Sequence, residues 1–327
     1  MRVFKKCFIT GITGSGGSYL AEHIHKNNKK IKIIGTYRSK GYLNLLRKKI
    51  KHLKVTKLDL NSFKGIQNYI KQNKPDLIFH FASSAQVRKS FDRPYEFIKN
   101  NNMITLNLLE AVRLANYKPL IIVCSSSEVY GQVKSSELPI KETQKILPIN
   151  PYAVSKSFQD ILSQVYLKCF DLKVIITRMF SYTNARRSDL FQASFANQII
   201  EIKNGKKKYL EHGNLKSKRS FIDIDDAMEA YWTVAKKGQI GEIYNISGDN
   251  VISVKLFLKK LIKFSNAKIN TKLNKRLLRK TDIKIQIPSC RKFYNHTGWK
   301  PRVTLDKSII KLLKACNEIK ENKYTYK

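Results

Sequence analysis

The chain has 327 residues, 42% of them hydrophobic, with 63 Lys and Arg against 24 Asp and Glu and a formal net charge of +39. The length and apolar content predict one large or two modest globular domains, and they exclude an intrinsically disordered chain. The sequence contains no apolar run long enough to span a bilayer, and its first residues, MRVFKKCFITGITG, lack the features of a secretory signal. We therefore expect a cytoplasmic protein with no membrane association.

The basic charge and the cysteines indicate no specialised site. Lysines are scattered through almost every segment and no nucleic-acid-binding motif accompanies them, so we expect no specific nucleic-acid partner. A basic surface also suits an anionic nucleotide-sugar and a dinucleotide. The five cysteines are an odd number without paired spacing, which predicts reduced, structural thiols and no metal site.

A dinucleotide-binding loop is predicted near the N-terminus. Arg2–Thr10 is expected to form a strand and Ser18–His25 a helix, with three spaced glycines between them. In that order, Gly11 permits a tight turn, Gly14 lets the backbone approach a pyrophosphate, and Gly17 lets the helix pack closely on the sheet. The alternative is a glycine turn without a ligand. The predicted cofactor-binding residues of this loop are Gly11, Thr13, Gly14 and Gly17.

The end of the second strand, Ile31–Tyr37, bears on the choice of cofactor. An enzyme that uses NAD carries Asp or Glu at this point for the ribose hydroxyls. Here Arg38, Ser39 and Lys40 follow instead. A cationic end suits a 2′-phosphate, so we predict that Arg38 binds NADP, with NAD as the alternative.

The next segments continue the alternation of strands and helices. Strands are expected at Val55–Leu58 and Asp76–Phe81, and helices at Ser62–Gln72 and Tyr95–Ala115. The second of these strands ends in small residues beginning at Ala82, which permit close approach of the nicotinamide half of a cofactor.

The most informative stretch begins with the apolar run Leu120–Cys124, the pattern of a strand buried on both faces. Ser126 and Glu128 follow this strand. Tyr152 comes after a proline suited to the first turn of a helix, and Lys156 lies four residues later on the same helical face. Because ligands bind at the carboxyl ends of such strands, we expect the four polar side chains to meet there.

These four residues suggest acid–base chemistry. An ammonium near a phenol, whose ordinary pKa is about 10, favours phenolate and would make Tyr152 a base near neutral pH. Ser126 can donate a hydrogen bond to the same substrate oxygen. The alternative is a surface helix that happens to contain Tyr and Lys.

The segments SSSEVYG and NPYAVSK resemble the catalytic segment of the extended short-chain dehydrogenase/reductase family of nucleotide-sugar enzymes, and most closely its GDP-mannose 4,6-dehydratase and 4-keto-6-deoxymannose reductase branches. The resemblance implies that Asp59 and Leu60 contact the adenine of the cofactor. It places Ser181 where relatives carry a substrate-contacting Asn. It also implies that Arg219 and Arg279 bind phosphate, and that the Tyr95–Ala115 and Tyr152 helices form a homodimer or homotetramer contact.

The remaining elements complete the expected fold. We expect strands at Lys173–Phe180 and Glu242–Ser247, helices at Phe191–Lys203 and Val254–Phe264, and a helix capped by Asp225 that runs through Ala235. Together the elements predict an α/β fold: a doubly wound parallel Rossmann sheet with a smaller, interleaved α/β substrate domain. The cofactor domain is expected at 1–178, with a return around 220–247, and the discontinuous substrate domain mostly at 179–327.

Three functions follow, and Glu128 discriminates between the first two. A 4,6-dehydratase needs a base for the proton at C5 of the sugar, and Glu128 can supply it, which favours conversion of GDP-mannose to GDP-4-keto-6-deoxymannose. A 4-keto-6-deoxy-sugar reductase or an epimerase needs only Ser126, Tyr152 and Lys156, and Glu128 would then cap the turn. The third possibility is a non-catalytic protein that binds NADP or nucleic acid.

Overall fold

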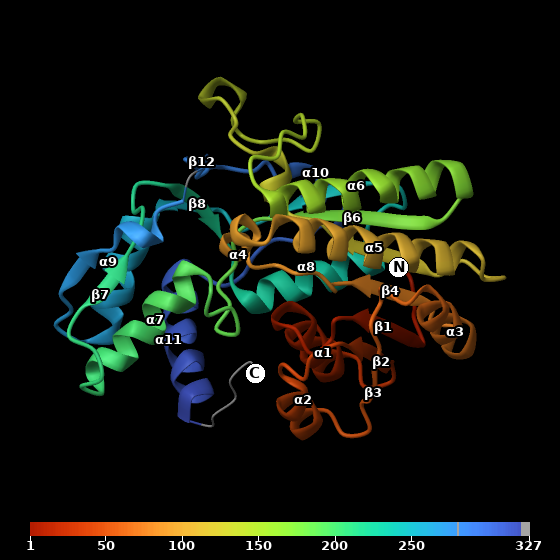
Figure 1. The fold of residues 1–327 in the computed structure, drawn as a ribbon, viewed down its shortest axis with the longest axis horizontal. Helices are drawn as coiled ribbons and strands as arrows, with labels where there is room; N and C mark the ends of the chain where they lie inside the picture. The colour runs from red at the N-terminus through yellow and green to blue at the C-terminus, as the bar shows by residue number, and fades with distance from the viewer. Residues whose placement is uncertain (280, 322–327) are drawn as a thin grey trace.

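The structure is a computed structural model that describes residues 1–279 and 281–321. Its centre is a seven-stranded parallel sheet in the order β3-β2-β1-β4-β5-β6-β9 (Figure 1). The chain enters the middle of the sheet with β1, builds one side, and then crosses to build the other. The strands are β1 Lys6–Thr10, β2 Lys32–Tyr37, β3 Lys54–Lys57, β4 Leu77–His80, β5 Leu120–Cys124, β6 Lys173–Met179 and β9 Ile243–Ile246.

Helices cover both faces of this sheet, which is why its inner strands are buried over most of their length. Every residue of β4 and β5 is buried. One apolar cluster joins the sheet to α3, α5 and α6, and a second joins it to α1, α8 and α10. The sheet helices are α1 Ser15–Asn27, α2 Leu43–Lys49, α3 Phe63–Asn73, α4 Val87–Asp92, α5 Pro94–Arg113, α6 Pro151–Phe170, α8 Ile224–Lys237 and α10 Arg291–Thr297.

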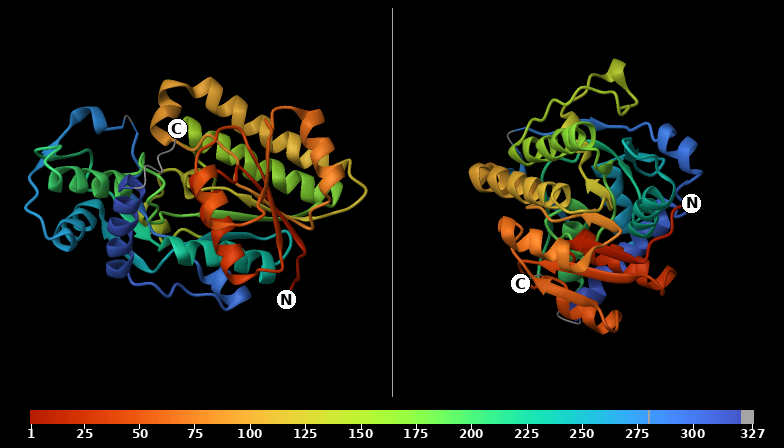
Figure 2. Two further views of the ribbon diagram at one scale, coloured as in Figure 1. Left: turned by 90° about the horizontal axis from the view of Figure 1, so that it is seen from below. Right: turned by 90° about the vertical axis from the view of Figure 1, so that its right-hand side faces the viewer.

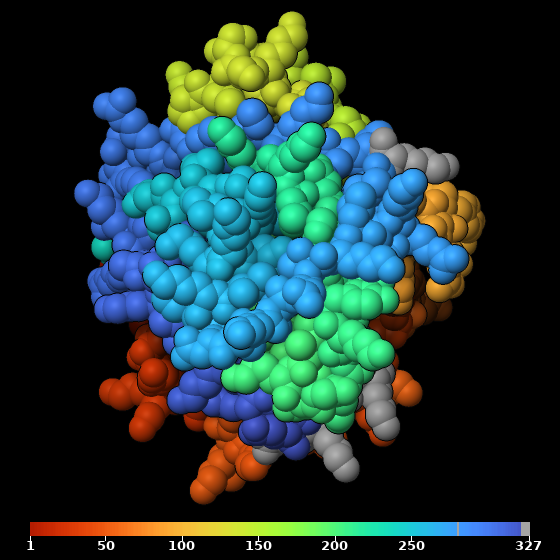
Figure 3. All heavy atoms as spheres, turned by 90° about the vertical axis from the view of Figure 1, so that its left-hand side faces the viewer, coloured from red at the N-terminus to blue at the C-terminus, as the bar shows by residue number. Residues whose placement is uncertain are grey.

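A smaller part of the molecule lies at one end of the sheet (Figure 2). Its helices pack around a third apolar cluster, and its short strands form a three-stranded sheet, β10-β8-β12, and a pair, β11-β7. Figure 3 views this end, where the segments coloured green to blue form most of the surface. Its elements are α7 Phe191–Lys203, α9 Val254–Ser265, α11 Leu305–Glu321, β7 Leu210–His212, β8 Lys218–Phe221, β10 Asn250–Ser253, β11 Thr271–Leu273, β12 Ile285–Gln286 and the 3-10 turn η3 Lys275–Leu277. Two further 3-10 turns, η1 Ser127–Tyr130 and η2 Ser135–Glu137, follow β5 of the main sheet.

The doubly wound parallel sheet confirms the predicted fold class. The chain returns to this sheet in α8 and β9 after entering the smaller part. The boundary at residue 178 between a cofactor domain and a substrate domain stays a prediction. Among the described residues, no helix combines the length and apolar character that crossing a membrane requires.

Several predicted boundaries differ by one or two residues, and two element starts and one helix cap are wrong. The first strand begins at Lys6 rather than Arg2, whose guanidinium instead donates to the carbonyl of Gly238 at 2.7 Å. The glycine-loop helix begins three residues earlier than expected, at Ser15. The cap of α8 is Asp223, not Asp225, because the Asp223 carboxylate accepts the backbone N–H of Asp225 at 2.9 Å.

Candidate active site

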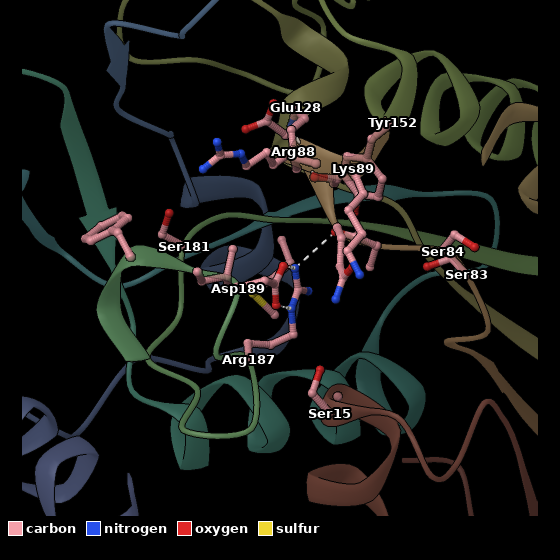
Figure 4. Close-up of a pocket in the computed structure, with 18 of the residues that line it drawn as sticks. Ser15, Ser83, Ser84, Arg88, Lys89, Glu128, Tyr152, Ser181, Arg187 and Asp189 are labelled. Atoms are coloured by element: carbon pink, nitrogen blue, oxygen red, sulfur yellow. Dashed lines mark hydrogen bonds and ion pairs between the residues drawn. The ribbon is translucent and has the colours of Figure 1, made fainter. Parts of the chain in front are cut away.

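A cavity of about 990 Å³ lies where β1, β4, β5 and β6 end and the smaller part begins. It sits at the point where the chain switches from building one side of the sheet to the other, the usual place for a ligand in a doubly wound fold. In the view of Figure 4, Glu128 and Tyr152 form one side of the cavity and Ser15 the other, with Arg187 and Asp189 between them.

The glycine loop is shaped for close approach. Gly11 has a φ of +64°, and a Cβ added there would lie 2.8 Å from the Cα of Ala82. A Cβ at Gly17 would lie 2.6 Å from the carbonyl oxygen of Gly11. The N-terminus of α1 therefore meets the cavity with bare backbone, and no side chain caps it. Backbone N–H groups in this position suit a pyrophosphate, so these residues fit a dinucleotide.

The other predicted cofactor residues fall into two groups. Arg38 lies on the cavity wall, exposed, with its guanidinium donating to Asn100 Oδ1 at 2.7 Å. Thr13 is buried behind the wall and donates its hydroxyl to the carbonyl of Ser39 at 2.9 Å. The lining of the cavity, taken over the described residues, includes Gly11, Gly14, Gly17 and Arg38 but not Thr13, Asp59, Leu60 or Ala82.

The four predicted catalytic residues all line this one cavity. The backbone of η1, which follows β5, places Ser126 and Glu128, and α6 places Tyr152 and Lys156. The Ser126 hydroxyl accepts the N–H of Glu128 at 3.2 Å and caps η1. Asn150 caps α6 through the N–H of Ala153 and donates to Glu128 Oε2 at 2.9 Å.

The pKa values of Tyr152 and Lys156 differ from our expectation. Burial raises the pKa of Tyr152 to about 12, although Arg187 and a hydrogen bond from Ser126 lower it. Burial lowers the pKa of Lys156 to about 8. The Lys156 Nζ donates to the carbonyl of Cys124 at 2.8 Å and to Gln159 Oε1 at 2.9 Å, rather than to Tyr152.

Arg187 is the site residue to which sequence reasoning gave no role. Its guanidinium forms a two-point ion pair with Asp189, with both N···O distances 2.8 Å, and donates to the carbonyl of Ala85 at 3.0 Å. Of the causes that lower the Tyr152 pKa, Arg187 is the largest. The only signal was the doublet Arg186-Arg187 after a strand, and 63 basic residues obscured it.

The neighbouring arginine fixes the segment that carries Arg187. The Arg186 guanidinium lies 3.8 Å from the ring centroid of Tyr19 and donates to Ser18 Oγ at 2.8 Å. Both partners belong to α1, so this contact ties the loop after β6 to the glycine-loop helix. This contact fixes the backbone next to Arg187 beside the glycine-loop helix.

The predicted substrate residues, Ser181, Arg219 and Arg279, also line the cavity. Arg219 is buried, and it donates to the carbonyl of Ile283 at 2.6 Å and lies 3.5 Å from Asp282 Oδ1. Burial lowers its pKa from the ordinary value. Arg279 is exposed and Ser181 half-buried, and both line the cavity. Among the described residues, no group of three or more His, Cys, Asp and Glu could hold a metal ion.

Comparison with known proteins gives a consistent result. A sequence model of the GDP-mannose 4,6 dehydratase family matches residues 8–312. The GDP-6-deoxy-D-mannose reductase of Pseudomonas aeruginosa is 29% identical over 241 residues, 73% of this chain and 79% of that protein. The GDP-mannose 4,6 dehydratase of Drosophila melanogaster is 26% identical over 349 residues, which cover 96% of this chain and 87% of that protein.

A solved structure shares the fold. The dTDP-glucose 4,6-dehydratase of Bacillus anthracis in complex with NAD superimposes with a TM-score of 0.85 at 21% identity, covering 97% of this chain and 98% of that one. At this identity the likeness shows the fold alone.

Proposed function

The chain belongs to the GDP-mannose 4,6-dehydratase family, and from this premise we propose that it is a nucleotide-sugar 4,6-dehydratase that converts GDP-mannose to GDP-4-keto-6-deoxymannose. The observation that carries the proposal is that Glu128 lines the same cavity as Ser126, Tyr152 and Lys156. A reductase or an epimerase of this family needs the last three residues but not a carboxylate.

Each catalytic side chain has one role in this proposal. An oxidised nicotinamide dinucleotide held at Gly11, Gly14 and Gly17 would supply the hydride chemistry, oxidation at C4 of the sugar and reduction at C6. Tyr152 takes the proton of the 4-hydroxyl, and Ser126 donates a hydrogen bond to the same oxygen. Glu128 removes the proton from C5 and passes it to the departing 6-hydroxyl, so that one water leaves. As the hydride returns to C6, C5 regains a proton from solvent through Glu128. Tyr152 releases to solvent the proton that it took from the 4-hydroxyl, so the protons balance. The net reaction consumes no cofactor.

The charges around Tyr152 set the conditions for its role. Its pKa of about 12 means that the protein without a ligand holds it as a neutral phenol at neutral pH. Arg187 and Lys156 are among the basic side chains that line the same cavity. As a neutral phenol, Tyr152 has to lose its own proton to solvent before it can accept the proton of the 4-hydroxyl, and we expect these cations to stabilise the phenolate that results.

Arg219 and Arg279 supply the contacts to the diphosphate of the substrate. Guanidinium groups bind phosphate oxygens at two points, and both arginines line the cavity from the smaller part of the molecule. Binding energy from this remote group holds the sugar at the catalytic residues. Arg38, in place of the carboxylate that reads an NAD ribose, favours NADP as the cofactor.

The helices that carry the site also suggest a dimer. Four apolar side chains of α6, at the spacing of one helical face, are exposed by 36–51%: Val154, Phe158, Ile161 and Val165. Such an apolar stripe is expected to be covered in solution. A second copy of the chain that packs its own α5 and α6 against this face gives a homodimer, or a homotetramer of two such pairs.

A turnover assay tests the proposal. The protein is incubated with GDP-mannose and a substoichiometric amount of NADP, without a reductant, and the sugar nucleotide is followed by mass spectrometry. Conversion of all the substrate to a product lighter by one water supports the dehydratase.

The second candidate is a reductase, which the 29% identity to the Pseudomonas aeruginosa reductase favours. It predicts no reaction here, but consumption of NADPH when a 4-keto-6-deoxy sugar nucleotide is supplied.

A further inference from the structure

A series of buried hydrogen bonds runs from Lys156 into the interior, away from the cavity. Lys156 donates to the Oε1 of Gln159 at 2.9 Å, and Gln159 donates from Nε2 to the carbonyl of Asn101 at 3.0 Å and to Thr105 Oγ1 at 2.5 Å. Thr105 Oγ1 lies 2.8 Å from His80 Nε2. Gln159 and Thr105 have no exposed surface. We call Lys156, Gln159, Thr105, His80 and Thr10 the Lys156 network.

The surroundings of Gln159 leave its amide only one orientation. The carbonyl of Asn101 can only accept a hydrogen bond, so the amide nitrogen of Gln159 must face it. The amide oxygen therefore faces Lys156. An inverted Gln159 amide would place its N–H group against the buried Lys156 amine, and its oxygen against the buried carbonyl of Asn101. The network thus presents Lys156 with an acceptor and never with a donor.

The rest of the network fixes its protons. Thr105 donates to the carbonyl of Asn101 at 3.0 Å, so its oxygen accepts from Gln159 and from His80 Nε2. His80 Nδ1 then accepts from Thr10 Oγ1 at 2.9 Å, and Thr10 accepts the N–H of Ala82 at 3.0 Å. Only this tautomer gives both threonine hydroxyl protons an acceptor. It keeps His80 neutral, in agreement with burial, which lowers its pKa to about 3.

Two hydrogen-bond acceptors take up two of the N–H groups of Lys156. The carbonyl of Cys124 takes one N–H at 2.8 Å and Gln159 takes another at 2.9 Å. A protonated amine has three N–H groups, so the third is available to the cavity that Lys156 lines. Both acceptors stabilise the ammonium against the burial that disfavours it.

We propose that Gln159 is a positioning residue for the reaction: through the Lys156 network it holds the Lys156 nitrogen as an ammonium with one N–H directed into the cavity. This inference rests on the proposed function, which gives Lys156 its role. Gln159 touches neither the cavity nor a reacting atom, because it is fully buried and absent from the residues that line the cavity. It acts only through Lys156.

Other groups also act on the Lys156 charge, and the test has to separate them. Arg187 from the loop after β6 disfavours the ammonium, and Cys124 from β5 favours it. Tyr152 lies one turn earlier on α6, and His80 in β4 is kept neutral partly by Lys156 itself. None of these groups changes when Gln159 is replaced, so a shift in the Lys156 titration that follows the replacement reports on Gln159.

The titration of Lys156 can be observed directly in the full chain without any sugar. Lysines labelled with ¹³C at the ε carbon are followed by two-dimensional NMR from pH 6 to 10, and Lys156 is assigned by the loss of its signal in Lys156→Arg. Gln159→Met keeps the size of the side chain but removes the acceptor, and Gln159→Glu makes the acceptor an anion. Gln164→Met is the matched control, since Gln164 lies on the same helix and, within the part of the chain that the structure describes, donates its side-chain hydrogen bonds to Asp160 rather than to Lys156 or its partners.

The proposal predicts opposite shifts. The Lys156 midpoint falls by about one pH unit in Gln159→Met, the size expected for loss of a hydrogen bond to a charged group. It rises in Gln159→Glu and stays unchanged in Gln164→Met. Because the two shifts differ in sign, either variant alone suffices if the other fails to fold. Equal midpoints in the wild type and the folded Gln159 variants overturn the proposal.

The outcome is independent of the substrate. A chain that converts no nucleotide-sugar but shows the opposite shifts supports the role of Gln159 and refutes the proposed function. A chain that dehydrates GDP-mannose, with a Lys156 midpoint that does not respond to Gln159, supports the proposed function and refutes the role of Gln159.

Discussion

The burial of His80 predicts how the stability of the fold depends on pH. His80 is 2% exposed and its pKa is lowered from 6.5 to about 3, chiefly by burial and then by Lys156. The unfolded chain therefore takes up a proton near pH 6.5, whereas the folded chain does so only near pH 3. As the pH falls from 6.5 towards 3, the unfolded state binds more protons than the folded state, and stability is lost.

The size of this effect follows from the pKa difference. Each pKa unit corresponds to about 1.4 kcal/mol, so that His80 alone reduces the free energy of unfolding by about 2 kcal/mol between pH 7 and pH 5. Aspartates and glutamates also titrate in acid, and a variant is needed to isolate the histidine. In His80→Gln the position no longer titrates, so the variant lacks this part of the pH dependence.

Urea unfolding at pH 7, 6 and 5 measures the difference. The wild type is expected to be more stable than His80→Gln at pH 7, because the variant loses hydrogen bonds to Thr10 and Thr105. That advantage should shrink by about 2 kcal/mol by pH 5. Curves of unfolding free energy against pH that run parallel for the two proteins would refute the assignment of a neutral, buried His80.

Four substitutions test the site. Tyr152→Phe should lower turnover by about 10²–10⁴-fold without changing NADP affinity, measured by fluorescence titration, since it removes the proton acceptor; retained turnover contradicts its role. Glu128→Gln should stop exchange of the C5 proton with deuterated water while C4 oxidation persists, and normal dehydration would make Glu128 a cap only. Arg187→Met should move the alkaline rise in kcat/KM to higher pH, because Arg187 lowers the pKa of Tyr152. An unchanged dependence of kcat/KM on pH would show that Arg187 does not act on Tyr152. Arg38→Ala should reduce the preference for NADP over NAD about tenfold or more, the size of a charged hydrogen bond; an unaltered ratio of the two Kd values removes Arg38 from cofactor recognition.

The elements that sequence analysis placed well are those with strong local patterns. The apolar run of β5 and the proline-started helix α6 put Ser126, Glu128, Tyr152 and Lys156 on one cavity, as expected. The glycine spacing likewise required a turn with positive φ at Gly11 and close contact with Ala82. In each case the pattern constrains the backbone within a few residues, and the parallel sheet then brings the strand ends together.

The features that sequence analysis missed depend on contacts between distant segments. The loop that carries Arg187 is tied to α1 by Arg186, and Arg187 itself donates to the carbonyl of Ala85, so nothing local to either arginine indicates its position near Tyr152. The pKa of Tyr152 was expected to be low, yet burial dominates it, and the extent of burial is set by the whole fold. In the sequence Gln159 is an ordinary helix residue, and only the folded chain places its buried amide between Lys156 and Asn101.

The central claim is that hydride leaves C4 and returns to C6 of the same sugar, with Glu128 moving the C5 proton between the two transfers. GDP-mannose carrying deuterium at C4 tests it most directly when it is incubated with unlabelled NADP and the product is analysed by mass spectrometry and NMR. The account predicts a 4-keto product that retains the deuterium in its C6 methyl group. A product without the label, or intact substrate together with consumption of NADPH by a 4-keto-6-deoxy sugar nucleotide, would contradict it.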